Sequence, residues 1–410
     1  MDMKKKRKNK REMLSYEDKP IEEYERDSEI KKRKELPKPK NKKVRTIVII
    51  GIILVLAVGI AAVWKFISPD SLMGSLFSSQ VKGDGFPVKI KGKSVNASDM
   101  CIINNSLAYI SETQFQMINS SGGVTVDKRI KYSSPAMKSC KNYSIIYDRQ
   151  GNGYEIQSAV GTVYEGSVDD IIFQAVIIDN GCYAILSKSD GYTSKLTVFN
   201  KDNTQKYAYY FSECYAVSIS LNKDATKAVV CGLDANEGSI VSKVYIIDFS
   251  SDKPESKIDF DNVTIYSAGF FDNGNIGIIG DRSAMVITSD YQNKYEFTYN
   301  GYNLISKKIM QNNIILSLSP FEDGKSCELW NISQNGFITS TKTDLAIVAV
   351  DVFGDNAAVL AGNTVSVFDI KKEKLLNEYN VELDSKGVTF LDEKTAYVLG
   401  TSEIRAIKLR

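Results

Sequence analysis

The chain contains no histidine in its 410 residues, and this absence excludes more chemistry than any other feature of the sequence. Without histidine there is no Ser-His-Asp or Cys-His pair to activate a nucleophile, and no histidine-containing zinc site. The six cysteines include no Cys-x-x-Cys pair, so the spacing typical of zinc ligands or thioredoxin-like motifs is missing as well. We therefore expect a protein that is not an enzyme and that has no metal site.

An excess of charge is also absent from the chain as a whole, but the two signs are unevenly distributed. Residues 1–45 contain 18 Lys and Arg against 10 Asp and Glu, a net charge of +8, whereas the remainder contains 34 against 40, a net of −6. Nucleic-acid binding depends on clustered positive charge, so we expect no nucleic-acid partner for this acidic remainder. The basic segment has few apolar residues and is predicted to be a disordered tail.

One stretch lacks charge altogether. TIVIIGIILVLAVGIAAVW, residues 46–64, is about as long as a helix that spans a bilayer. A cleaved signal peptide is disfavoured because a 45-residue polar leader precedes the stretch, and a core helix would need a polar face. We expect a single transmembrane helix over residues 46–66 that contacts the lipid bilayer.

The basic flank of this stretch predicts the topology. Because positively charged segments stay on the cytoplasmic side, residues 1–45 are expected to be cytoplasmic. Residues 67–82 are then a linker, and residues 83–410 form an extracytoplasmic domain at the plasma membrane.

That domain contains an internal repeat. Its copies are FQMIN (115–119), YEIQS (154–158), LTVFN (196–200), VYIID (244–248), AMVIT (284–288), CELWN (327–331), VSVFD (365–369) and IRAIK (404–408). The first and third positions are apolar or aromatic in every copy, and the fourth is apolar in all but one, where it is Gln157. This alternation is typical of a strand with a buried face, and a spacing of roughly 40 residues is typical of a propeller blade.

The surroundings of each copy complete a blade. A second apolar strand precedes every copy through a polar turn, a third follows seven of them, and segments such as YAVSIS and AIVAVDV supply an innermost strand. The sequence therefore predicts an all-β, eight-bladed propeller of four-stranded antiparallel blades, with seven blades as the alternative. The last copy lacks a following strand, so we expect residues 86–92 to pair with the last blade and close the ring.

The segments VSVFDIKKEKLLNEYN (365–380) and VSISLNKDATKAVV (217–230) resemble blades of the WD40 and quinoprotein-like β-propeller superfamily. CELWN is close to the Trp-Asp ending of a WD40 blade. The Trp-docking pattern of quinone-binding blades is absent, since the only tryptophans are Trp64 and Trp330, so the resemblance implies no quinone and we expect no cofactor. The whole layout resembles bacterial single-pass membrane proteins that carry an external propeller of unknown function.

The cysteines leave two possibilities open. An even number outside the cytoplasm permits disulfides, while positions such as Cys231, inside an apolar strand, suit a free buried thiol.

The function predicted from these features is a non-catalytic binding or scaffold module of the cell envelope, whose partner is an envelope protein or a cell-wall glycan. The alternative is a carbohydrate-binding or carbohydrate-active envelope protein that uses loop carboxylates. Two long loops are expected at 233–243 and 320–326. The candidate partner-binding residues are acidic or polar residues of these loops and two tyrosines of an outer strand: Asp234, Asn236, Glu237, Glu322, Asp323, Tyr209 and Tyr210.

Overall fold

The computed structural model describes residues 49–52, 80–92, 95–236 and 238–410. The chain divides into two compact units, Met1–Ile67 and Ser68–Arg410, and in the first of them residues 49–52 are helical. None of the helices among the described residues has both the length and the apolar character needed to cross a bilayer. The predicted tail (1–45) lies outside the described residues, as do most of the predicted membrane helix (46–66) and linker (67–82).

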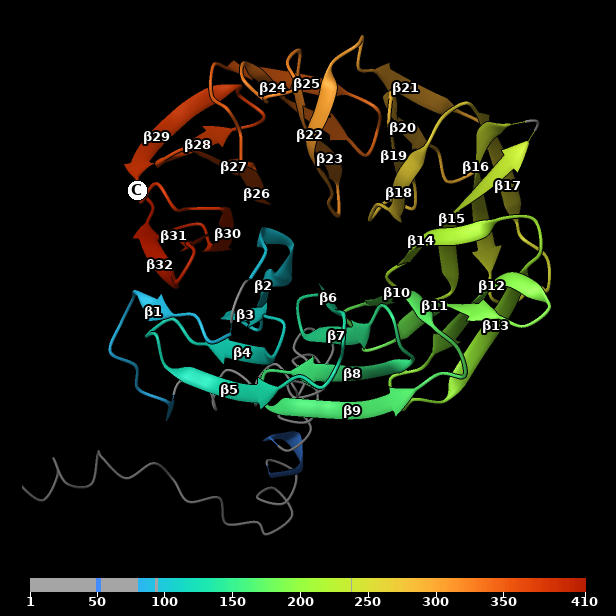
Figure 1. Cartoon of the computed structure of the whole chain (residues 1–410), viewed down its shortest axis with the longest axis horizontal. Helices are drawn as coiled ribbons and strands as arrows, with labels where there is room; N and C mark the ends of the chain where they lie inside the picture. Colours follow the sequence, from blue (N-terminus) through green and yellow to red (C-terminus); the bar gives the residue numbers. More distant parts are fainter. Residues whose placement is uncertain (1–48, 53–79, 93–94, 237) are drawn as a thin grey trace, which may run out of the picture. The chain divides into compact units, whose positions relative to one another are not determined.

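The second unit is an eight-bladed β-propeller, which confirms the predicted fold class and rules out the seven-bladed alternative. Its strands form eight four-stranded antiparallel sheets, arranged around a ring in Figure 1. We number the blades 1 to 8 in chain order, from the sheet β2-β3-β4-β5 to the sheet β30-β31-β32-β1.

The first two strands of each blade lie nearest the centre of the ring. The innermost strands are β2 (Met100–Ile103), β6 (Pro135–Ser139), β10 (Ile172–Ile177), β14 (Tyr215–Leu221), β18 (Ile265–Phe270), β22 (Asn303–Ile309), β26 (Ala349–Phe353) and β30 (Gly387–Asp392). The second strands are β3 (Ser106–Ile110), β7 (Tyr143–Asp148), β11 (Tyr183–Ser189), β15 (Lys227–Asn236), β19 (Ile276–Gly280), β23 (Asn313–Ser319), β27 (Asn356–Ala361) and β31 (Thr395–Leu399). A short 3-10 helix, η1 (Ala97–Asp99), precedes β2.

The third strands contain the repeated motif. They are β4 (Gln114–Ile118), β8 (Gly153–Ser158), β12 (Tyr192–Phe199), β16 (Ser239–Asp248), β20 (Ser283–Ile287), β24 (Cys327–Ser333), β28 (Thr364–Asp369) and β32 (Glu403–Lys408). The outer strands are β5 (Val124–Arg129), β9 (Gly161–Ser167), β13 (Gln205–Phe211), β17 (Ser256–Asp261), β21 (Lys294–Thr298), β25 (Ile338–Thr343), β29 (Lys374–Asn380) and, in blade 8, β1 (Val88–Lys89).

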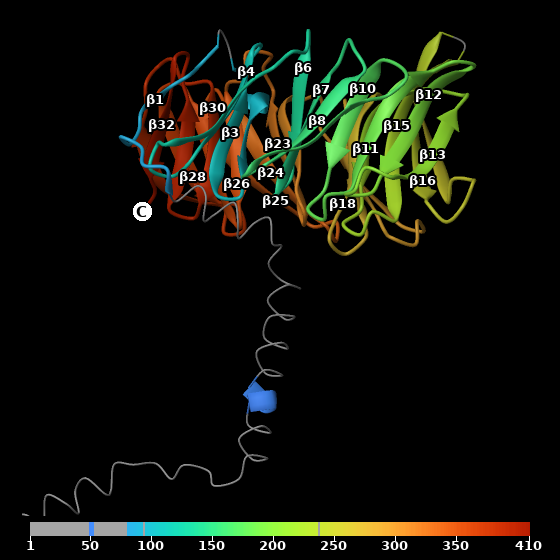
Figure 2. The same cartoon turned by 90° about the horizontal axis from the view of Figure 1, so that it is seen from below.

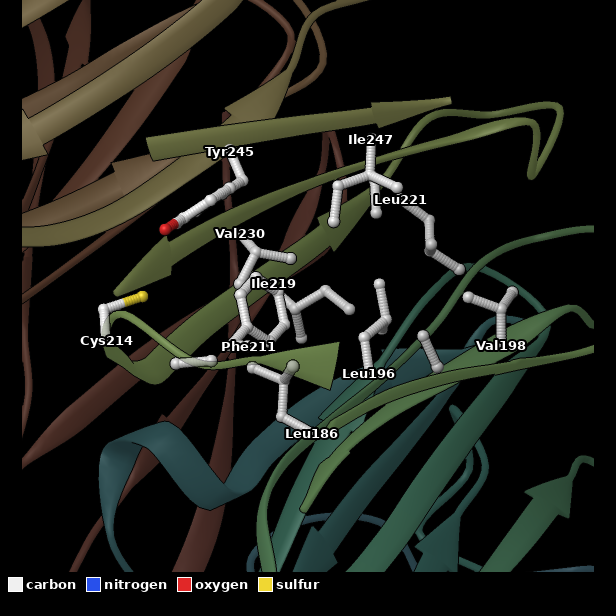
Figure 3. Close-up of a cluster of buried hydrophobic side chains, with 13 residues drawn as sticks. Leu186, Leu196, Val198, Phe211, Cys214, Ile219, Leu221, Val230, Tyr245 and Ile247 are labelled. Carbon is white, nitrogen blue, oxygen red and sulfur yellow. The ribbon is translucent and has the colours of Figure 1, made fainter. Parts of the chain in front are cut away.

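The apolar core lies between the blades and not within them. Each of the eight buried clusters takes side chains from two neighbouring blades. Figure 3 shows the cluster between blades 3 and 4, where Leu186 and Leu196 of blade 3 face Val230 and Ile247 of blade 4. Because strand residues alternate between two faces, each third strand sends one set of side chains to each neighbour.

Gln157, the exception in the repeat, belongs to a polar network between blades 1 and 2. Its amide donates to Glu155 (3.0 Å), and Lys128 of β5 donates to Glu155 (2.7 Å) and to Glu165 of β9. Glu155 is only 5% exposed, and a carboxylate so buried needs such partners. Gln157 therefore donates a hydrogen bond to a buried carboxylate that is paired with a lysine. The other blades have an apolar residue at this position of the motif.

The segment before blade 1 contacts blade 8. Val88 and Lys89 pair antiparallel with Ile404 and Glu403, and the Phe86 ring lies 4.9 Å from the ring of Tyr397, centroid to centroid. This strand is two residues long, shorter than the predicted 86–92. Blades 8 and 1 also share a buried cluster, which Phe86 contacts.

We predict that Phe86→Ala lowers the free energy of unfolding by about 2 kcal/mol, because a half-buried ring loses its packing on Tyr397. Chemical denaturation of the full-length protein measures the change. Val124→Ala, on an exposed position of β5, is the control and should shift stability by less than about 0.5 kcal/mol. Equal losses in the two variants would show that the segment before β1 adds nothing to the stability of the ring.

Candidate functional site

The direction of the strands gives the ring two different faces. Antiparallel order places the turns between second and third strands, and the connections from each outer strand to the next blade, on one face, which we call the upper face. The turns between first and second strands and between third and outer strands form the lower face. The propeller is seen edge-on in Figure 2, with the upper face at the top.

The lower face is where the chain joins the propeller. Asn119, in the turn between β4 and β5, donates through its side chain to the carbonyl of Val81 (2.7 Å). Ser121 in the same turn accepts from the backbone N–H groups of Gly83 (3.2 Å) and Gly85 (2.9 Å). Residues 81–85 are thereby held against one lower turn of blade 1.

The upper face carries a set of exposed apolar side chains where the innermost strands begin. Six residues of this kind, each 40–81% exposed, form what we call the collar: Ile171, Tyr215, Val217, Tyr266, Val348 and Leu383. They come from blades 3, 4, 5 and 7 and from the connection into blade 8. Among the described residues the lower turns also carry exposed apolar side chains, among them Val160, Phe337 and Phe353. The collar differs because its members lie at the start of the innermost strands, where neighbouring blades are in contact.

Two collar residues are exposed because of irregular pairing. The register of β14 on β15 shifts between Ala216 and Ser218, and that of β18 on β19 shifts between Ile265 and Ser267. The unpaired residues at these bulges are Val217 and Tyr266, and a bulge is a common way to re-aim a side chain. The ammonium of Lys307 lies over the Tyr266 ring, 4.5 Å from the ring centroid.

Sequence reasoning predicted the strands that contain these residues but missed their exposure. The signal was present, since three apolar residues are consecutive in YAV (215–217) and nearly so in VTIY (263–266), where strict alternation fails. A bulge cannot be located from that pattern alone.

The prediction of a loop at 233–243 in blade 4 is wrong. β15 and β16 continue as a regular ladder as far as the pair Asn236 and Ser239, so this segment is an elongated hairpin and Asp234 lies in a strand. Asp and Asn are poor strand formers, but Asp234 and Asn236 pair across the hairpin with Val241 and Ser239. Glu237, another candidate, lies outside the described residues.

The carboxylate of Asp234 already has a partner. Its oxygen lies 3.2 Å from the ammonium of Lys243, which is also 3.5 Å from Glu213. A hydrogen bond from the backbone of Ala235 and the ion pair with Lys243 hold the pKa of Asp234 below its usual value. Asp234 therefore belongs to a charge network at the upper edge of blade 4.

The other acidic candidates do lie in a loop, between β23 and β24. Asp323 pairs with Lys325 (2.9 Å), and that lysine lowers the pKa of the carboxyl through a side-chain hydrogen bond. Glu322 lies beside it, next to the exposed ring of Phe321. The structure thus places Asp234 and this pair on the upper side of different blades and does not bring them into one site.

The two candidate tyrosines of β13 point in opposite directions. Tyr209 packs edge-on against Phe211 (4.9 Å between centroids), beside the core shared by blades 3 and 4. Tyr210 is exposed and lies against Tyr192, with the ammonium of Lys195 5.4 Å from its ring centroid. Only Tyr210 is available for binding.

The carboxylate nearest the centre of the ring is structural. Asp351 of β26 is buried, accepts hydrogen bonds from the hydroxyl of Thr389 (2.9 Å) and the N–H of Phe390 (2.8 Å), and forms an ion pair with Lys308. It therefore joins the innermost strands of blades 6, 7 and 8.

None of the six cysteines forms a disulfide. Burial raises the pKa of Cys101 to about 11 and those of Cys140 and Cys231 to about 12. No group of three or more Cys, Asp or Glu side chains with metal-binding geometry occurs in the part of the chain that the structure describes.

Fold and repeat define the chain as an eight-bladed β-propeller, and the predicted resemblance to WD40 and quinoprotein-like propellers is confirmed at the level of the fold. The model of the Family of unknown function (DUF5711) matches residues 86–409, and the chain belongs to this family. No curated protein matches the chain.

Several solved structures are similar in fold. The computationally designed Ika8 protein has a TM-score of 0.60 and 12% identity, over 78% of this chain and 98% of that one. Hydrazine synthase of Kuenenia stuttgartiensis has a TM-score of 0.46 and 10% identity, over 78% and 97% of the two chains. The Pan2 WD40 domain of Neurospora crassa has a TM-score of 0.46 and 9% identity, over 68% and 90%.

We predict that the unfolded, unreduced protein takes up six alkyl groups from iodoacetamide, one for each free thiol. In the native protein at pH 8, Cys101, Cys140 and Cys231 should react slowly, because only about one thiol in a thousand or fewer is ionised when its pKa is 11 or above. Mass spectrometry of peptides gives the rate at each site. Fewer than six additions after unfolding would reveal a disulfide.

Proposed function

We propose that the protein is a membrane-anchored, extracytoplasmic, non-catalytic scaffold that binds an envelope protein on its upper face. The observation that carries this proposal is the collar, whose six apolar side chains are exposed around the beginning of the innermost strands. Exposed apolar clusters of this kind mark interaction surfaces in soluble domains. Tyrosines, of which the collar has two, are enriched among the residues that dominate binding energy.

The position of the chain before blade 1 supports the choice of face. Residues 81–85 contact a lower turn, on the face opposite the collar. We infer also that β1, by pairing with β32, is the strand that closes the ring. A closed ring presents its upper turns as a fixed surface.

The charges near the collar suit a protein partner better than catalysis. The candidate carboxylates Asp234 and Asp323 pair with lysines, and Asp351 is bound within the ring. The chain has no histidine, and these three carboxylates are already engaged in ion pairs.

We predict that Tyr215→Ser combined with Tyr266→Ser weakens partner binding at least tenfold, because the loss of two exposed aromatic anchors costs more than about 1.4 kcal/mol. A photo-crosslinking amino acid at position 266 of the full-length protein, in its native membranes, should give a discrete adduct. The adduct should decrease in a variant that also carries Tyr215→Ser.

Position 295 is the matched control. Tyr295 lies on the outer strand of the same blade and has the same exposed fraction as Tyr266, 44%. The same adducts from both positions, or a yield from position 266 that Tyr215→Ser leaves unchanged, would contradict docking on the collar.

A further inference from the structure

A pocket of about 450 Å³ opens between blades 2 and 3, at the periphery of the upper face. Its walls are the connection between β9 and β10 on one side and the outer half of blade 3 on the other. The lining comprises Ser167, Val168, Asp169, Asp170, Ser187, Lys188, Ser189, Asp190, Lys195, Thr197, Phe199, Gln205 and Tyr210. The volume lies within the range of about 300–1,000 Å³ that is usual for small-ligand sites.

Two nearly buried hydroxyls on the pocket wall have no hydrogen-bond partner. Ser187 of β11 and Thr197 of β12 are each 5% exposed, and neither side chain forms a hydrogen bond within the described chain. Both lie on the face of blade 3 that is turned toward blade 2. Neither oxygen is among the fully enclosed atoms that lack a partner, so both hydroxyls are open to the pocket and can bond to what fills it.

The interface between blades 1 and 2 has a side chain where the interface between blades 2 and 3 has the pocket. Thr197 and Glu155 occupy the same place in the repeat, the second position of the third-strand motif, and are equally buried. At Glu155 the side chain of Lys128 crosses from the preceding blade and forms an ion pair. At Thr197 no side chain of blade 2 does so, and the space is the pocket.

The charged side chains of the pocket are of both signs and are not paired with one another. Three aspartates, at 169, 170 and 190, and the lysines at 188 and 195 line it, with no ion pair between them. Mixed charge disfavours a simple anion or cation as the ligand. Many donors and acceptors around a space whose lining charges nearly cancel favour a ligand with many hydroxyl groups.

An aromatic pair forms the rim. Tyr210 lines the pocket and Tyr192 packs on it with ring centroids 4.9 Å apart; both rings are about half exposed. An exposed aromatic face suits the C–H face of a sugar ring, while the carboxylates and hydroxyls below it can bond to the sugar hydroxyls.

We propose that this pocket binds a neutral saccharide. Ser187 and Thr197 bond to its hydroxyls, the aspartates accept further hydrogen bonds, and Tyr210 stacks on the ring. The site shares no residue with the collar, so saccharide binding can be measured without the proposed protein partner.

Calorimetric titration of the full-length protein with the neutral disaccharides cellobiose, maltose and chitobiose tests the proposal. A polyoxyethylene detergent is required, because maltoside and glucoside detergents present sugars themselves. At least one disaccharide should bind, and Ser187→Ala and Thr197→Val should each weaken binding about fivefold or more, the usual effect of removing one hydrogen bond. Tyr210→Ala should weaken it further.

Ser317→Ala is the matched control. Ser317 also lies in a second strand, is buried and has no partner, but it is in blade 6 and away from the pocket. It should leave affinity unchanged, and thermal unfolding of each variant confirms folding. The proposal fails if no disaccharide binds, if only a zwitterionic dipeptide does, or if the three pocket variants bind as tightly as Ser317→Ala.

Discussion

Every blade of this propeller has two apolar faces, and neither can be buried without a neighbour. The eight apolar clusters each join two successive blades, and the last joins blade 8 to blade 1. A four-stranded sheet on its own would expose one face or the other, so the blades are stable only as a set. The rest of the structure follows from this requirement: the repeat of roughly 40 residues, the alternation in every third strand, and the contact of Phe86 with Tyr397.

This requirement explains why the fold could be predicted and where prediction stopped. The alternation in motifs such as VSVFD indicates a strand, and the polar turns between apolar segments indicate hairpins. Eight blades could therefore be counted from the sequence. The 233–243 segment contains Asp, Asn and Gly, which have low strand propensity, and cross-strand pairing outweighs that preference. Val217 and Tyr266 depend on bulges, which shift pairing by one residue and leave no distinct signal.

The candidate site could be predicted only in part, for a related reason. Sequence identifies charged residues but not their partners, and Asp234 and Asp323 are matched by Lys243 and Lys325. Exposed apolar residues are harder still to recognise, since in sequence they resemble core. The same bulge occurs in blades 3, 4, 5 and 6, and in two of them it brings an apolar side chain of the innermost strand to the surface as part of the collar.

The spaces between blades widen with distance from the axis of the ring, and side chains of different lengths fill them at different distances. Near the axis, short apolar side chains fill the gap, whereas at the periphery a long side chain has to reach across it. Between blades 1 and 2, Lys128 does so and forms an ion pair with buried Glu155. Between blades 2 and 3 the residue equivalent to Glu155 is Thr197, and Gly166 of blade 2 occupies the position of Lys128, so it has no side chain to cross the gap. The Thr197 hydroxyl is open to the pocket, so a bound ligand can form a hydrogen bond with it. The difference between these two interfaces is therefore the physical reason to expect a ligand at the second and not at the first.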